Sequence, residues 1–254
     1  MKIRVLGYNG GIALNWHTTS FLIDDDILID AGTGVSKLAL PEMRRITDIF
    51  LTHSHLDHVA GVPLMIDSIF SQIEKPVRVY ARPETLAALR HHIFNWEIWP
   101  DFSVLPTTES PVIRFVELPP GGSVNLGGRT IHSIPVNHVV PAVGYCVEGG
   151  GAVFAFSGDT TTNDSFWDGL NRFERVDLLF VEAAFPDSDL DIALKSKHYC
   201  PKLLAADLPK LRHRPKICLT HPKPGAEDVI LAECQTQLKG FTIKTLEGNE
   251  VFQI

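Results

Sequence analysis

The chain has 254 residues, of which 44% are hydrophobic and 21% are charged. This balance excludes a disordered chain, because the sequence carries enough apolar surface to offset the entropy lost on ordering. The formal net charge is −7 and no basic stripe is present, which argues against a binder of long nucleic acid.

No apolar run approaches the ~18 residues that a membrane span needs. The start, Met1–Gly7, reads as a strand rather than a signal peptide, so the expected location is the cytoplasm. The four cysteines, Cys146, Cys200, Cys218 and Cys234, are widely spaced and are expected to be free thiols. No repeat, linker or charge block divides the chain, which predicts one domain over residues 1–254.

The first half is predicted to be rich in strands. Short apolar runs bounded by turn residues predict strands at Ile3–Leu6, Ser20–Ile23, Ile27–Asp30, Asp48–Leu51 and Val77–Tyr80. Apolar residues at helical spacing predict helices at about Val59–Ile69 and at Pro83–Asn95.

The second half continues in the same style. Strands are predicted at Ile113–Leu118, Thr130–Val136, Val143–Val147, Val153–Phe156, Leu178–Val181 and Lys216–Leu219, and helices near Pro201–Leu211 and Ala226–Leu238. The stretch Ala152–Phe156 is wholly apolar, as is typical of a strand buried on both faces. Two strand-rich halves, each followed by helices, predict a sheet-on-sheet core with helices outside.

One short segment gathers four side chains that can bind metal. His53, His55, Asp57 and His58 lie within six residues, after an apolar segment and before a predicted helix. We therefore expect them on a strand-to-helix loop, where the side chains can converge on one point. Imidazole nitrogen and carboxylate oxygen are suitable ligands for zinc, iron or manganese.

Three further polar residues follow predicted strands later in the chain. His138, Asp159 and His221 each come shortly after a strand, and functional side chains often lie on loops at strand ends. Each of them alone would be read as an ordinary turn or structural residue. Together with the first cluster they predict one metal site.

In this order, the His-Ser-His-Leu-Asp-His segment, the spaced histidine, the Gly-Asp pair and the last histidine resemble the metallo-β-lactamase superfamily. The resemblance implies an α+β fold, a four-layer αββα sandwich with a two-metal site at one edge of the sheets. It implies that one divalent ion is held by His53, His55 and His138, and the other by Asp57, His58 and His221, with Asp159 bridging them. Zinc is the ion expected first, and manganese or iron would suit the same donors.

Other segments resemble the class II 3′,5′-cyclic-nucleotide phosphodiesterases. They are His58–Gly61, Phe94–Phe102, Glu182–Pro186, Ser196–Leu204 and Thr220–Gly225. The resemblance implies hydrolysis of cyclic AMP or cyclic GMP by a hydroxide bridged between two metals, with 2′,3′-cyclic nucleotides not excluded. In this scheme Asp57 orients the nucleophile, and His198 contacts the phosphate and assists the leaving group. Lys197 and Lys223 are candidates for added positive charge near the phosphate.

Two pairs of residues have supporting roles in this interpretation. Asp30 and Thr52 are candidates to hydrogen-bond the metal-binding histidines and fix their orientation. Trp96 and Trp99 leave three alternatives open: stacking on a purine base, packing at an interface, or ordinary core. The resemblance favours a homodimer.

Rival functions stay open because one fold hosts many reactions. One group is other dinuclear metallo-hydrolases, such as thioester or lactone hydrolases and the tRNA 3′-processing endonuclease, which needs a basic arm that is not seen here. Another is a diiron oxygen-binding or redox-sensing protein, although such proteins commonly carry Glu where this chain has His55. A third is a protein that binds a cyclic nucleotide without cleaving it. The expected partner is a small cyclic nucleotide, with no membrane and no long nucleic acid.

Overall fold

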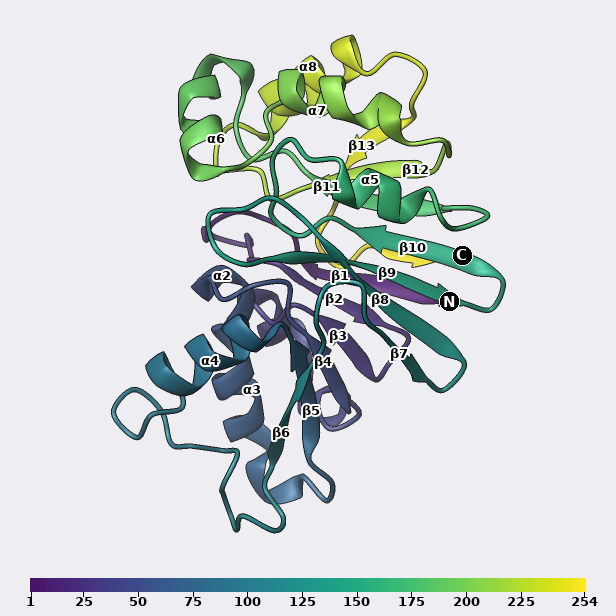
Figure 1. Cartoon of the computed structure of the whole chain (residues 1–254). Helices are drawn as coiled ribbons and strands as arrows, with labels where there is room; N and C mark the ends of the chain where they lie inside the picture. Colours follow the sequence, from purple (N-terminus) through teal and green to yellow (C-terminus); the bar gives the residue numbers. More distant parts are fainter.

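The computed structural model describes residues 1–254 and contains two seven-stranded sheets that pack face to face (Figure 1). The first sheet has the order β14 (Val251–Gln253), β1 (Lys2–Gly7), β2 (Ser20–Ile23), β3 (Ile27–Ile29), β4 (Asp48–Phe50), β5 (Val77–Ala81) and β6 (Ile113–Glu117). The second has the order β13 (Ile243–Thr245), β12 (Lys216–Thr220), β11 (Leu178–Glu182), β10 (Ala152–Phe156), β9 (Val143–Gly149), β8 (Arg129–Pro135) and β7 (Ser123–Leu126). Both sheets mix parallel and antiparallel pairs.

Helices cover the outer faces of both sheets (Figure 1). The first half carries α1 (Leu40–Met43), α2 (Leu56–Val59), α3 (Gly61–Ile69) and α4 (Pro83–His92), with 3₁₀ turns η1 (Thr33–Lys37) and η2 (Phe70–Gln72). The second half carries α5 (Ser165–Leu170), α6 (Leu190–Ser196), α7 (Pro201–Asp207) and α8 (Glu227–Gln237), with η3 (Asp187–Asp189) and η4 (Leu208–Lys210). The predicted αββα sandwich is therefore confirmed. None of the helices is long and apolar enough to cross a lipid bilayer.

The strands supply two apolar faces because successive side chains point to opposite sides. In β2, Phe21 and Ile23 pack between the sheets, whereas Leu22 packs under the helices of the first sheet. The layer between the sheets is rich in aromatic rings in edge-to-face contact. Phe21 lies 4.9 Å from Phe156 and 5.0 Å from Phe180, measured between ring centroids.

An ionic cluster joins the two sheets at the turn between β2 and β3. Arg129 of β8 forms a two-pronged hydrogen bond with Asp26, at 2.6 and 2.8 Å, and a further bond of 3.0 Å with Asp24. Paired guanidinium–carboxylate bonds of this kind are directional as well as strong. The cluster fixes this end of one sheet against the other.

The predicted helix over 59–69 is wrong at its start. A separate helix, α2, begins at Leu56, so Asp57 and His58 lie on a helix rather than on the predicted loop. The chain then breaks at Ala60, because the Gly61 N–H donates to Ala31 O at 2.7 Å instead of to the carbonyl four residues earlier. The break redirects α3 across the outer face of the first sheet.

Two other helices are shorter than predicted. The helix expected to reach Asn95 ends at His92, where the Phe94 N–H turns back to Leu89 O. The helix expected to reach Leu211 ends at Asp207 and continues as η4, because Pro209 has no N–H to extend the α-helical pattern.

Apart from α2, three strands and three short helices were not predicted. The strands are β7, β13 and β14, and the helices are α1, α5 and α6. Of these, β14 changes the topology, because it pairs with β1 and so places the last strand in the first sheet rather than the second. The four cysteines are free, as predicted, and all are buried.

Candidate metal centre

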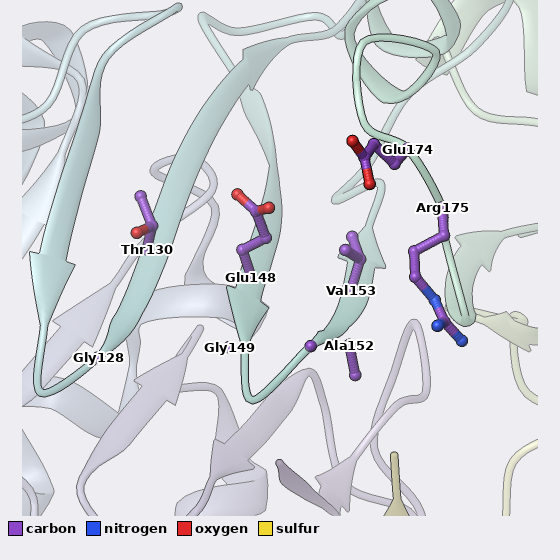
Figure 2. A pocket seen from close by; sticks show the side chains of 9 residues that line it. Gly128, Thr130, Glu148, Gly149, Ala152, Val153, Glu174 and Arg175 are labelled. Carbon is purple, nitrogen blue, oxygen red and sulfur yellow. The ribbon is translucent and has the colours of Figure 1, made fainter.

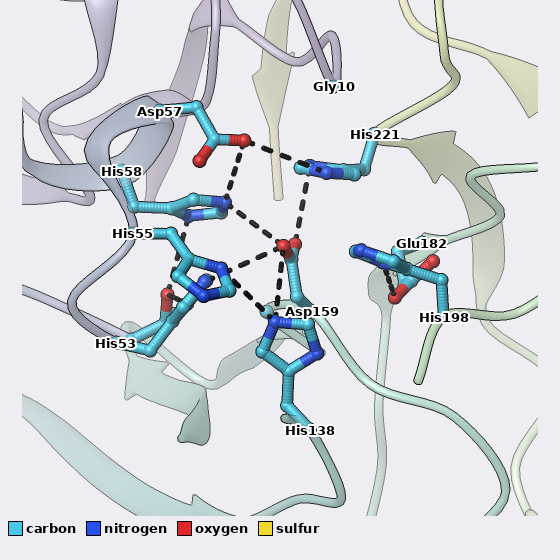
Figure 3. A network of polar contacts seen from close by, with 12 residues as sticks. Gly10, His53, His55, Asp57, His58, His138, Asp159, Glu182, His198 and His221 are labelled. Carbon is cyan, nitrogen blue, oxygen red and sulfur yellow. Dashed lines mark hydrogen bonds and ion pairs between the residues drawn. The ribbon is translucent and has the colours of Figure 1, made fainter. Parts of the chain in front are cut away.

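All seven predicted metal-binding residues meet at one edge of the sandwich (Figure 3). Their side chains come from the segment after β4, from α2, and from the loops after β8, β10 and β12: His53, His55, Asp57, His58, His138, Asp159 and His221. Both sheets thus contribute, and residues up to 168 positions apart become neighbours, from His53 to His221.

The first group consists of His53, His55, His138 and Asp159. Their nearest nitrogen and oxygen atoms all lie within 4.8 Å of one another. The Asp159 Oδ2 atom is 3.6 Å from His53 Nε2 and 4.0 Å from His138 Nε2. This is the set that the sequence assigns to one metal ion.

The second group consists of Asp57, His58, Asp159 and His221, again within 4.8 Å. Asp159 Oδ2 lies 3.3 Å from His58 Nε2, and Asp159 Oδ1 lies 3.2 Å from His221 Nδ1. Asp57 Oδ2 is 3.7 Å from Nε2 of both His58 and His221. Asp159 belongs to both groups, as a bridging ligand must.

Several atoms in these groups are buried and have no hydrogen-bond partner: His53 Nε2, His58 Nε2, Asp159 Oδ1 and His221 Nδ1. An unpartnered buried polar atom costs free energy, so native structures rarely keep several in one place without a ligand. Imidazole and carboxylate donors of this kind suit divalent ions. The residues present therefore fit the metal pair that the sequence predicts.

A buried carboxylate orients one of the histidines. Asp30 Oδ2 accepts a 2.7 Å hydrogen bond from His58 Nδ1, which leaves His58 Nε2 directed at Asp159. Asp30 Oδ1 accepts from the Thr52 N–H at 2.8 Å, and Thr52 Oγ1 lies 3.0 Å from His53 Nδ1. The predicted contacts of Asp30 and Thr52 with the histidines are present, and such contacts fix ring orientation at metal sites.

His198 lies beside the second group and is hydrogen-bonded to a buried carboxylate, that of Glu182. Its Nδ1 atom is 2.7 Å from Glu182 Oε1, and its ring is nearly parallel to that of His221, with centroids 5.1 Å apart. Glu182 also accepts the N–H groups of Thr160 and Tyr199, at 2.7 and 3.1 Å. Glu182 is thus held on every side, and it holds His198 in turn.

Sequence reasoning gave Glu182 no role. The sequence signal that could identify it is a lone carboxylate at the end of an apolar strand, β11. Glu182, His198 and Asp159 form a third group of potential ligand atoms within 4.8 Å. His198 is therefore next to the centre although it is remote from most of its residues in sequence.

Burial lowers the pKa of several of the histidines, although the Asp159 and Asp30 carboxylates outweigh it at His58 and raise the pKa of that ring well above its usual value. Burial lowers the pKa of His53 and His221 well below the ordinary range and lowers the pKa of His138 to about 4. The neutral imidazole is the form that binds a metal ion. Burial alone would also lower the pKa of His198, but the Glu182 carboxylate outweighs it and raises this pKa above its usual value.

The centre opens to solvent on the side of Asp57. The Asp57 side chain is 28% exposed, whereas that of His58 is fully buried and that of Asp159 is 2% exposed. A separate hollow of about 420 Å³ is lined by residues that include Thr130, Glu148, Glu174 and Arg175, and Figure 2 shows these side chains. No group of potential metal ligands lines that hollow, and all such groups lie at the metal centre.

The two tryptophans behave differently. Trp99 is partly buried against the core under the helices of the first sheet, in line with the core interpretation. Trp96 is 63% exposed, so that interpretation is wrong for this residue. Base stacking and a homodimer interface both stay predictions for Trp96.

Comparison with known proteins gives one family and several relatives. The model of the Beta-lactamase superfamily domain matches residues 25–221. A probable 3′,5′-cyclic-nucleotide phosphodiesterase of Yersinia pestis is 26% identical over an alignment that covers 83% of this chain and 72% of that protein. A ribonuclease Z of Bradyrhizobium diazoefficiens is 31% identical over 117 residues, covering 44% of this chain and 36% of that protein. The crystal structure of unliganded yeast PDE1 shares the fold, with a TM-score of 0.83, 20% identity and 98% of each chain covered.

Proposed function

Because the chain belongs to the β-lactamase superfamily, we propose that it is a metal-dependent phosphodiesterase that hydrolyses 3′,5′-cyclic nucleotides to 5′-nucleotides. One observation carries the proposal: two groups of ligand atoms share Asp159, and a histidine fixed by a buried glutamate lies beside them. The likeness to a protein named as a probable cyclic-nucleotide phosphodiesterase supports the substrate class.

The seven ligand residues would hold two divalent ions, one in each group, with zinc expected first. When bound, two such ions lower the pKa of water to about 7 and neutralise charge on the phosphate oxygens. The neutral histidines need no proton release before they bind, because burial already holds His53, His138 and His221 in that form.

Asp57 is placed to orient the attacking water. Its carboxylate is partly open to solvent, and its Oδ2 atom faces both His58 and His221. A carboxylate oxygen accepts a hydrogen bond from water and so fixes the direction of its lone pair. The attack must come in line with the departing 3′ oxygen of the ribose.

His198 is placed to protonate that oxygen. Because Nδ1 bonds Glu182, the opposite nitrogen, Nε2, is the one free to donate to a substrate. A ribose alkoxide leaves poorly without a proton, and a positioned acid contributes about 10²- to 10⁴-fold in rate. Glu182 acts through His198 and is a positioning residue.

A second candidate is an RNA-processing endonuclease of the ribonuclease Z type. The similarity to ribonuclease Z over part of the chain favours it. The net charge of −7 weighs against it, because an RNA substrate carries many phosphates that need cationic partners. The two candidates share the centre and differ in the size of the substrate.

The test is the product formed by the purified, metal-loaded protein. Cyclic AMP, cyclic GMP, 2′,3′-cyclic AMP, bis(p-nitrophenyl) phosphate and a precursor tRNA are incubated separately and resolved by chromatography. We expect 5′-AMP or 5′-GMP, and we expect a chelator to abolish it. An Asp159→Ala variant should lose metal and activity together, because Asp159 belongs to both groups, whereas the exposed Asp168→Ala should not.

Other outcomes would replace the proposal. Cleavage of the activated ester alone would mean a metallo-hydrolase with a different natural substrate, including a thioester or lactone. Cleavage of the precursor tRNA alone would favour the endonuclease. No cleavage, together with an optical spectrum of bound iron, would favour the oxygen-binding or redox-sensing class.

A further inference from the structure

Lys223 places a positive charge at the metal centre without a carboxylate partner. Its Nζ atom lies 3.4 Å from His221 Nε2 and donates a 2.9 Å hydrogen bond to Gly10 O. Lys2, Lys210 and Lys244, in contrast, each form an ion pair with an aspartate or glutamate. The half-buried Lys223 ammonium contacts only neutral groups, the Gly10 carbonyl and the His221 ring nitrogen.

The backbone around Lys223 is fixed in place. Its N–H donates to Ala184 O at 2.9 Å, and the prolines on both sides, Pro222 and Pro224, restrict the chain. Pro222 O accepts the Gly10 N–H at 3.0 Å. The rigid loop therefore directs the Lys223 ammonium to the His221 side of the centre.

The loop after β1 reaches this point only because residue 10 is a glycine. A Cβ atom at Gly10 would lie 2.8 Å from His221 Cδ2 and 3.0 Å from His221 Nε2, closer than side chains tolerate. Figure 3 shows Gly10 on the same side of the centre as His221. The carbonyl that holds Lys223 is thus part of the wall of the site.

The charges of the centre call for an anion at this position. Two divalent ions held with the carboxylates of Asp57 and Asp159 would leave the ligand set about two charges positive, and Lys223 would add one more. A cation beside such a centre is repelled unless an anion lies between them. A phosphate oxygen is a stronger acceptor for an ammonium than the neutral Gly10 carbonyl.

We propose that Lys223 is a substrate-binding residue that contacts the phosphate of the anionic substrate on the His221 side of the centre. The inference rests on the proposed function, because it assumes a substrate that carries a phosphate. In this proposal the hydrogen bond to Gly10 O holds the Lys223 ammonium beside the centre until a phosphate oxygen replaces the carbonyl as its acceptor.

The experiment measures binding of inorganic phosphate to the metal-loaded protein by titration calorimetry, after the metal content of each variant has been determined. We expect Lys223→Met to keep its metal and to bind phosphate about 10- to 100-fold more weakly, as befits one charge-assisted hydrogen bond. Lys223→Arg should restore much of the affinity. Lys195→Met is the matched control, because it removes the same charge from an exposed position on α6 that makes no ion pair.

Two results would overturn the inference. Unchanged phosphate affinity in Lys223→Met with full metal content would remove Lys223 from the binding site. Loss of metal in the same variant would make Lys223 a structural support of the loop instead. If phosphate binding falls as expected but no cyclic nucleotide is cleaved, the contact stands and the proposed reaction fails, so the two can be told apart.

Discussion

Gly10 packs so closely against His221 that a larger residue at position 10 would overlap the histidine. The contact leaves no room for a methyl group beside His221, a residue whose own backbone is in the left-handed region at a φ of 62°. The residues are 211 positions apart, and only the tertiary structure brings them together. No pattern in the sequence points to this contact.

We expect Gly10→Ala to weaken the second metal group, because the added methyl displaces the His221 ring. The bound metal should fall from two ions toward one, and elemental analysis after dialysis against a weak chelator measures it. Gly11→Ala is the control, since its Cβ would meet only ring carbons of Pro224, at 3.0 and 3.1 Å. Two tightly bound ions in Gly10→Ala would contradict the expectation.

Glu182 provides a second test at the level of single residues. Glu182→Gln should keep its metal and KM but lose kcat by about 100-fold or more, because His198 is no longer held and polarised by a carboxylate. His198→Ala should behave alike. The rate with bis(p-nitrophenyl) phosphate separates this from a structural defect, because p-nitrophenolate leaves without a proton and its release should change little. An equal loss on both substrates would remove the acid role.

How far single residues could be predicted depends on their type and spacing. The histidine-rich segment at 53–58 is distinctive in the sequence, and the fold brings it beside His138, Asp159 and His221. Their role as ligands stays a prediction. Glu182 is one acidic residue among 30, and its importance comes from burial and from the three groups that bond to it.

At the scale of elements, the break between α2 and α3 explains the position of two candidate ligands. Asp57 and His58 are on the first turn of α2. Gly61 is the first residue of α3, and it packs against the backbone of the turn that follows β3. A Cβ at Gly61 would lie 2.5 Å from Gly32 O and 2.7 Å from Ala31 O. The helix is therefore forced to change direction where the two segments touch.

Gly61→Ala reveals whether this contact matters. Alanine ordinarily stabilises a helix relative to glycine by about 1 kcal/mol. Here we expect a loss of about 1–3 kcal/mol in the free energy of unfolding, because the new methyl overlaps two carbonyl oxygens. Urea denaturation followed by circular dichroism measures the change. A more stable Gly61→Ala variant would show that the helix pair can shift.

Elements with a strong pattern could be predicted, and those with a weak one could not. The strand at 152–156 is entirely apolar and was predicted to within one residue, at Val153–Phe156, whereas β13 and β14 have three residues each and mix polar with apolar side chains. The predicted helix ends were wrong where a local hydrogen bond or a proline ended the helix, as at Phe94 and Pro209. Such ends depend on single contacts rather than on periodicity.

At the scale of the whole molecule, two strand-rich halves were enough to predict the layered fold but not the order of the strands in each sheet. The pairing of β14 with β1 crosses from the second half of the chain to the first sheet. It is favoured by Phe252, which packs between the sheets near Phe180, at 5.3 Å between ring centroids. Contacts between residues so far apart carry no local signal in the sequence.

Removal of metal should destabilise the whole molecule. A ligand that binds only the folded state stabilises it by about 4 kcal/mol when its concentration is about 1,000 times its Kd. We expect a chelator to lower the melting temperature in one cooperative transition, as measured by calorimetry, and added zinc to restore it. A chelator that leaves the melting temperature unchanged would argue against metal binding at this centre.

The ionic cluster of Arg129 has a mechanical consequence when it is considered together with the metal centre. Arg129 fastens the second sheet to Asp26 of the first, and each group of ligand atoms likewise draws residues from both sheets. Besides the aromatic layer, polar groups therefore link the sheets at two places, and only the link at the metal centre would depend on a bound ion. We therefore expect loss of the ion to act first on the edge at which the ligand residues meet, while Arg129 and the aromatic layer still hold the two sheets together.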